Sequence, residues 1–122
     1  MTKPLMVHVI TNFAGVGGAE MMLARLIQCT EQQYKHVIIA LMKTSEVYQS
    51  TLDRCQAHYA LDWNGINTLG TVSKLRTLLK KLQPATVQCW MYHANVLTSL
   101  SIIGLAQKPK VVWGIHHSLA SP

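Results

Sequence analysis

Three short segments of the chain combine glycine, histidine and asparagine in ways that could bind a ligand. The first is a glycine-rich loop containing Gly15, Gly17 and Gly18, which precedes a helical pattern. Glycine lets the backbone approach a ligand closely, and the unpaired N–H groups at a helix start attract anions. We therefore expect a phosphate or a sugar hydroxyl to lie against Gly17 and Gly18. A tight strand-to-helix turn without a ligand is the alternative reading.

This loop differs from the common nucleotide-binding motifs. No Gly-Lys-Ser or Gly-Lys-Thr follows it, so it is not a P-loop. Glu20 stands where a dinucleotide-binding loop has its third glycine, and the next apolar run ends in Met42 and Lys43 rather than in an acid. Dinucleotide binding is therefore not expected. Glu20 would also interact favourably with the helix dipole, which is a sufficient structural reason for its position.

The second and third segments contain His93 with Asn95, and the pair His116 and His117. A histidine at the end of a strand can hydrogen-bond a substrate hydroxyl or stabilise a developing charge. The alternative for His93 and Asn95 is that they cap backbone groups of a helix. No carboxylate or thiolate stands at a metal-binding spacing from these histidines, so no metal is expected. His8 is expected in the core, and His36 and His58 on the surface.

Alternating apolar runs and helical patterns position these segments. Apolar runs predict five strands, at Leu5–Ile10, Val37–Met42, Tyr59–Leu61, Thr86–Trp90 and Lys110–Ile115. Between them, helical spacing predicts helices from Ala19 to Thr30, from Thr44 or Ser45 to Cys55, from Val72 to Leu82 and from Ala94 to Ala106. Pro84 is expected to stop the third helix.

Strict alternation of strands and helices predicts an α/β fold, a Rossmann-like parallel sheet with helices on both faces. The expected strand order is 3-2-1-4-5. Ligands of such sheets bind beyond the carboxyl ends of the strands where the order reverses, here between the first and fourth strands. The loops 12–18, 91–95 and 116–118 converge at that point.

Positive charge is concentrated in the second half of the chain. Residues 1–62 hold five basic and five acidic side chains, whereas residues 63–122 hold six basic residues and no acid. Four of the six, Lys74, Arg76, Lys80 and Lys81, lie on the third predicted helix. They form either a solvated face or a surface for anionic lipid. Nucleic acid is not expected, because the tryptophans are not interleaved with the basic residues.

Composition bounds the remaining possibilities. The 122 residues are 49% hydrophobic and 13% charged, which suits one compact domain. Cys29, Cys55 and Cys89 are scattered and odd in number, so we expect a reducing compartment. The first residues lack the pattern of a signal peptide, and Pro84, Gln88 and other polar residues interrupt the long uncharged stretch 82–107. We expect a cytoplasmic protein without a membrane span.

The sequence resembles glycosyltransferase family 4 at three blocks in the family's order and spacing. These blocks run from Val9 to Glu20, from Pro84 to Asn95 and from Val111 to Ser118, and together they span nearly the whole chain. The resemblance implies a GT-B enzyme, in which two Rossmann-like domains face a cleft and sugar is transferred with retention of configuration. The family needs no metal or cofactor, and it often builds lipopolysaccharide, capsule or glycolipid.

By this resemblance, residues 1–122 form the acceptor-side domain, and the donor-binding domain is a second domain that this chain lacks. The loop Gly15–Gly18 would face the donor diphosphate and the acceptor. His93 would contact the transferred sugar, and His116 would line the acceptor side. The partners are then a nucleotide-sugar and a saccharide or lipid-linked acceptor, and we expect the 122 residues alone to be inactive. Two other functions remain open: a stand-alone phosphate- or nucleotide-binding module, and a basic domain that docks on membranes without catalysis.

Overall fold

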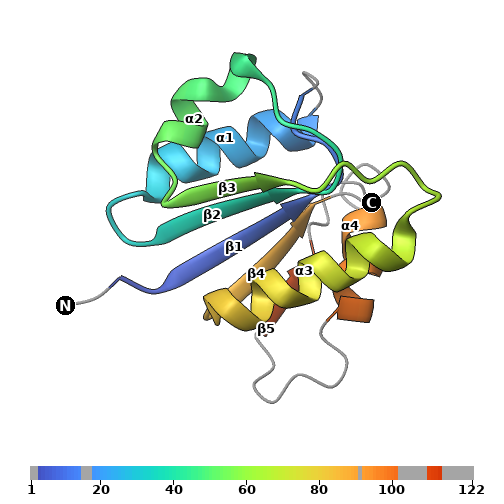
Figure 1. Cartoon of the computed structure of the whole chain (residues 1–122). Helices are drawn as coiled ribbons and strands as arrows, with labels where there is room; N and C mark the ends of the chain where they lie inside the picture. Colours follow the sequence, from blue (N-terminus) through green and yellow to red (C-terminus); the bar gives the residue numbers. More distant parts are fainter. Residues whose placement is uncertain (1–2, 15–17, 91, 102–109, 114–122) are drawn as a thin grey trace, which may run out of the picture.

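The computed structural model describes residues 3–14, 18–90, 92–101 and 110–113 (Figure 1). For Tyr92, His93, Asn95 and Lys110–Trp113 it describes the backbone alone. Strands and helices alternate along the chain in the order β1 (Leu5–Ile10), α1 (Gly18–Thr30), β2 (Lys35–Ala40), the 3-10 turn η1 (Glu46–Tyr48), α2 (Gln49–Asp53), β3 (Ala57–Ala60), α3 (Thr68–Leu82), β4 (Thr86–Trp90), α4 (Tyr92–Ser101) and β5 (Lys110–Trp113). None of the described helices has the length and apolarity needed to cross a bilayer.

The strands form one parallel sheet in the order β3-β2-β1-β4-β5. The central strand β1 pairs with β2 on one side and with β4 on the other. At the outer edges, β3 pairs with β2 and the four-residue β5 pairs with β4. The α/β class and the order of the first four strands confirm the expectation, and the reversal of strand order falls between β1 and β4 as expected.

The helices cover both faces of the sheet, with α1 and α2 on one side and α3 and α4 on the other (Figure 1). Alternate residues of β1 divide between the two layers, since successive side chains of a strand point to opposite faces. Val7 and Val9 pack with Leu75 and Leu79 of α3. On the other face, Ile10 joins a cluster that contains residues of α1 and α2. The core of both layers is mainly apolar, and its burial stabilises the sheet between them.

Local residue chemistry sets the limits of the elements. The Ser45 side chain accepts a hydrogen bond from the Val47 N–H and so caps η1, as expected for this position. The helix α3 ends at Leu82 and is capped by Gln83, whose φ of 46° is left-handed and whose N–H donates to the Leu79 carbonyl. Pro84 follows directly and cannot extend the helix.

Two differences from the sequence expectations concern β2. The strand covers Lys35–Ala40 rather than Val37–Met42, so it begins and ends two residues earlier than the apolar run. His36 was expected on the surface, and this is wrong: its side chain is only 1% exposed. The reason is a buried hydrogen bond to His8, described below. The expected last turn of α4 and the residues after Trp113 lie outside the described part of the chain.

Candidate functional site

The carboxyl ends of β1 and β4 lie side by side at the reversal of strand order. The last residues of the two strands, Ile10 and Trp90, are paired in register. Each strand is followed by a helix, and these helices begin at Gly18 and Tyr92. Two helix N-termini therefore lie beyond one edge of the sheet, where parallel α/β sheets bind ligands. This edge is the candidate site.

Gly18, the first residue of α1, is exposed and borders open space. A Cβ atom added at Gly18 would meet no heavy atom within 4 Å. The surrounding protein therefore leaves room at this position, and a ligand could approach the N-terminal backbone of α1. Gly15 and Gly17, also expected in this site, lie outside the described residues.

The segment that precedes the glycine loop is held by aromatic stacking and a backbone hydrogen bond. The ring of Phe13 is fully buried and stacks on Tyr48 with a centroid distance of 4.2 Å. The Phe13 N–H donates to the Lys43 carbonyl at 2.9 Å. These contacts tie the chain after β1 to the chain after β2, so the approach to Gly18 has a rigid base.

Glu20 is a buried acid next to this base, with 6% of its surface exposed. It lies in the first turn of α1, on the same buried face as Leu23 and Ile27. Burial, and then the negative charge of Glu20, raises the pKa of the Tyr48 phenol. This neighbourhood was not predicted from the sequence. The spacing of Glu20, Leu23 and Ile27 was the available signal, because it places the acid on the apolar face of the helix.

A chain of buried hydrogen bonds starts from Trp90, at the end of β4. Trp90 Nε1 donates to His8 Nδ1 at 3.2 Å, and His8 Nε2 lies 2.8 Å from His36 Nδ1. His36 Nε2 lies 3.0 Å from Thr30 Oγ1, whose hydroxyl donates to the Leu26 carbonyl at 2.7 Å. The chain crosses β4, β1 and β2 and ends on α1.

The hydrogen-bond partners determine which nitrogen of each neutral histidine ring carries the proton. The indole of Trp90 can only donate, so His8 Nδ1 accepts and neutral His8 carries its proton on Nε2. That proton is donated to His36 Nδ1, which places the proton of His36 on Nε2, facing Thr30. Burial, and then the charge that His36 would carry, lowers the pKa of His8 to about 3. Burial also lowers the pKa of His36, against the opposing effects of Thr30 and Glu31. His8 is buried as expected, but it is a hydrogen-bonded member of a network rather than a packed ring alone.

The remaining expected site residues are placed to different degrees. His93 is the second residue of α4 and Asn95 the fourth, so their backbone lies at the same sheet edge as Gly18. Their side chains lie outside the structural description, as do His116 and His117. Gly18 and the first turn of α4, which carries His93 and Asn95, thus lie at the same edge of the sheet.

Metal and thiol chemistry have little support in the described residues. Across these ranges, no group of three His, Cys, Asp or Glu side chains is arranged to hold a metal ion. Burial raises the pKa of Cys55 to about 12 and that of Cys89 to about 11. Both thiols are therefore protonated at neutral pH and are poor nucleophiles.

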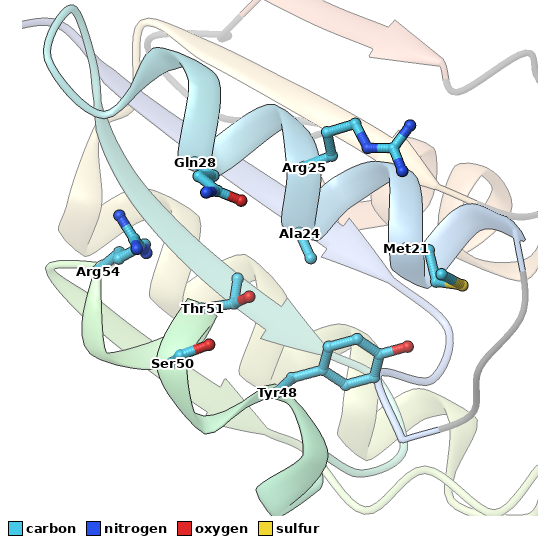
Figure 2. A pocket seen from close by; sticks show the side chains of 8 residues that line it. All are labelled: Met21, Ala24, Arg25, Gln28, Tyr48, Ser50, Thr51 and Arg54. Atoms are coloured by element: carbon cyan, nitrogen blue, oxygen red, sulfur yellow. The ribbon is translucent and has the colours of Figure 1, made fainter.

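A separate groove of about 330 Å³ lies between α1 and the segment formed by η1 and α2 (Figure 2). On the α1 side the groove is lined by Met21, Ala24, Arg25 and Gln28. On the other side it is lined by Tyr48, Ser50, Thr51 and Arg54. Arg54 forms an ion pair with Glu31, which offsets much of its charge. In Figure 2 Arg25 points away from Arg54. The two cations therefore do not converge on one anion.

The four basic residues expected at a membrane surface differ in environment. Lys74, Lys80 and Lys81 are exposed on α3. Arg76 is half-buried, and its Nη1 donates to the Ser101 carbonyl at 3.5 Å, across to α4. Arg76 therefore contributes to helix packing, whereas the three lysines face solvent.

Comparison with protein-family models finds no match for the chain, and comparison with curated proteins finds none either.

Proposed function

We propose that this chain is the acceptor-side domain of a retaining glycosyltransferase. The transferred sugar comes from a nucleotide-sugar, and the acceptor is a saccharide or a lipid-linked saccharide of an envelope polysaccharide or glycolipid. The observation that carries the proposal is the open space at Gly18, at the sheet edge where strand order reverses and where α4 also begins. The resemblance of the same segments to glycosyltransferase family 4 is the reason for assigning a nucleotide-sugar and its acceptor to that space.

In this proposal the backbone at the start of α1 contacts the donor diphosphate and the adjoining acceptor. Two effects favour an anion there: unpaired N–H groups and the positive end of the helix dipole. His93, in the first turn of α4, hydrogen-bonds the transferred sugar, and Asn95 and His116 or His117 contribute further polar contacts. A second domain supplies the main donor contacts, so residues 1–122 bind ligand weakly and do not catalyse transfer alone. We place the reaction in the cytoplasm, at the inner membrane face for a lipid-linked acceptor.

Isothermal titration calorimetry of the 122-residue chain with UDP-glucose, GDP-mannose and the free nucleoside diphosphates tests this proposal. We expect weak binding that the Gly18→Val variant loses, because a β-branched side chain fills the open space. The control is Gly70→Val: Gly70 is also exposed, helical and free of contacts within 4 Å of an added Cβ, but it lies on α3. Equal binding by the wild type and Gly18→Val would contradict the proposal. Gly18-dependent binding of nucleotide with no transfer in any longer form of the protein would favour the stand-alone binding module.

A further inference from the structure

Ile66 and Leu69 are the most exposed large hydrophobic side chains of the described residues, at 92% and 87%. They lie at the start of α3, on the turn that follows β3. An exposed isoleucine on a disordered surface would need no explanation, but this turn is fixed by several hydrogen bonds. The two side chains are therefore held in water, and moving them into an apolar phase would be favourable.

The fixed turn is built from two asparagines. Asn64 Oδ1 accepts hydrogen bonds from the N–H groups of Ile66 and Asn67, at 2.9 and 3.1 Å. Asn67 Oδ1 accepts one from the Asn64 N–H at 2.9 Å. Gly65, between them, has a φ of 88°, which glycine adopts without strain. This network points Ile66 outward and leaves its side chain without a packing partner in the described structure.

The outer face of α3 adds positive charge to this apolar pair. Leu75 and Leu79 face the core. At 100° per residue the outer side of the helix carries two stripes about 120° apart, one with Leu69 and Lys80 and the other with Lys74 and Lys81. The sequence has no acid after Asp62, so no carboxylate on α3 or α4 neutralises the three lysines. Arg76 is excluded from this surface because it bonds the Ser101 carbonyl.

We propose that Ile66, Leu69, Lys74, Lys80 and Lys81 form a docking surface for an anionic lipid bilayer. The axis of α3 lies along the membrane, the lysines contact lipid phosphates, and Ile66 and Leu69 enter the headgroup region. This inference goes beyond glycosyl transfer and stands without it. It differs from a contact made by basic residues alone, because the apolar pair anchors the domain.

The composition of the surface favours a bilayer over a macromolecular partner. A stable protein interface buries about 800 Å² on each partner around an apolar centre. Here the surface holds two exposed apolar side chains, with long, flexible lysines on the same helix. A single-stranded nucleic acid would be bound by exposed aromatic rings. The nearest aromatic residue, Trp63, is half-buried, and its Nε1 donates to Thr68 Oγ1.

Bilayer binding by the three lysines and bilayer binding by Ile66 and Leu69 depend differently on the salt concentration. Charge attraction to the bilayer is screened over about 8 Å at physiological ionic strength. The insertion of apolar side chains is not weakened by salt. Changing the salt concentration therefore separates the lysines from the apolar pair within one experiment.

The experiment is co-sedimentation of the 122-residue chain with vesicles of phosphatidylcholine alone, or of equal parts phosphatidylcholine and phosphatidylglycerol, at low and high salt. We expect binding to the anionic vesicles only. The K74Q/K80Q/K81Q variant should lose most of the low-salt binding. The I66Q/L69Q variant should bind about tenfold more weakly at either salt concentration, because the loss of two apolar side chains is not restored by charge.

Matched controls change the same residue types elsewhere on the exposed surface. M22Q/V47Q alters two exposed apolar residues on the α1 and α2 side, and K3Q/K35Q/K43Q removes three exposed lysines of the first half. Both controls should bind as the wild type does. Full binding by I66Q/L69Q, or no binding of the wild type to anionic vesicles, would overturn the proposal. So would sedimentation equilibrium showing a dimer that I66Q/L69Q dissociates, since a second copy would then cover this surface.

Discussion

Nε2 of His8 and Nδ1 of His36 lie 2.8 Å apart in the interior of the domain, on neighbouring strands. Both rings are neutral, and every donor of the chain from Trp90 to Leu26 finds an acceptor in the same direction. Protonation of either ring would place two donors face to face or leave a buried charge. This relationship makes the fold sensitive to acid.

The pKa shifts give the first prediction, a loss of stability below pH 6.5. A histidine whose folded pKa is below its unfolded value of about 6.5 binds a proton more readily after unfolding. Its contribution is complete above pH 6.5 and is lost as the pH falls toward 3, the folded pKa of His8. We expect the free energy of unfolding to fall by about 1.4 kcal/mol per pH unit below pH 6 from His8 alone.

Urea denaturation at a series of pH values measures this slope. His8→Gln should be less stable at pH 7 and should lose part of the acid dependence. His58→Gln is the matched control, because His58 is exposed on β3 and lacks this network. A His8→Gln protein with the wild-type pH slope would show that the acid sensitivity comes from other groups. Glu31, which faces His36 and is paired with Arg54, is the nearest of these.

The far end of the network gives a second prediction. Thr30→Val removes the acceptor of the His36 Nε2–H and the donor to the Leu26 carbonyl. We expect a loss of about 1–3 kcal/mol, the cost of leaving a buried donor without a partner. Thr77→Val is the control, since Thr77 makes the same bond to the carbonyl four residues earlier, at 2.9 Å, but is exposed. Equal destabilisation in chemical denaturation would mean that the helix, rather than the network, accounts for the effect.

Core and surface positions of α3 should respond differently to truncation. Leu75 is fully buried, and Leu75→Ala should cost about 2–5 kcal/mol of unfolding free energy. Leu69 is 87% exposed, and Leu69→Ala should change stability by no more than about 0.5 kcal/mol. Thermal unfolding compares the two variants directly. A large loss for Leu69→Ala would show that Leu69 is packed against the domain and is not available to a bilayer.

The proposed role of His93 predicts an effect on turnover rather than on folding. In an enzyme that contains this domain together with a donor-binding domain, His93→Ala should lower kcat by about 100-fold or more. Its melting temperature should stay close to that of the wild type. Steady-state kinetics and calorimetry on the same preparations make the comparison. Unchanged kcat, or a collapse of the melting temperature, would assign His93 a structural role.

The sequence predicted best those elements whose signal is local. The strands β1 and β4 have the bounds expected from the sequence, although His8 interrupts the apolar run of β1, and Thr86 and Gln88 of β4 are polar and half-buried. The start of β2 was missed because His36 looks polar in the sequence. Its burial depends on His8, which lies 28 residues earlier, and such a distant pairing leaves no periodic signal.

The candidate site was predictable in position but not in detail. The alternation of strands and helices predicted the reversal between β1 and β4, so the location of Gly18 and of the α4 start followed from topology. The different environments of Arg76 and Lys80 were not predictable, because both are basic residues on one helix. Only the position of α4 shows that Arg76 reaches the Ser101 carbonyl.

The central position of β1 also has a consequence for the order in which the protein can fold during synthesis. Of the five strands, β1 is made before the others and can pair with β2 early, but its other edge requires β4. The hydrogen bond from Trp90 to His8 joins residues 82 positions apart. Until β4 has been made, one edge of this central strand stays unpaired, and other chains can contact it. The nascent domain is therefore most vulnerable to aggregation between the synthesis of β2 and that of β4.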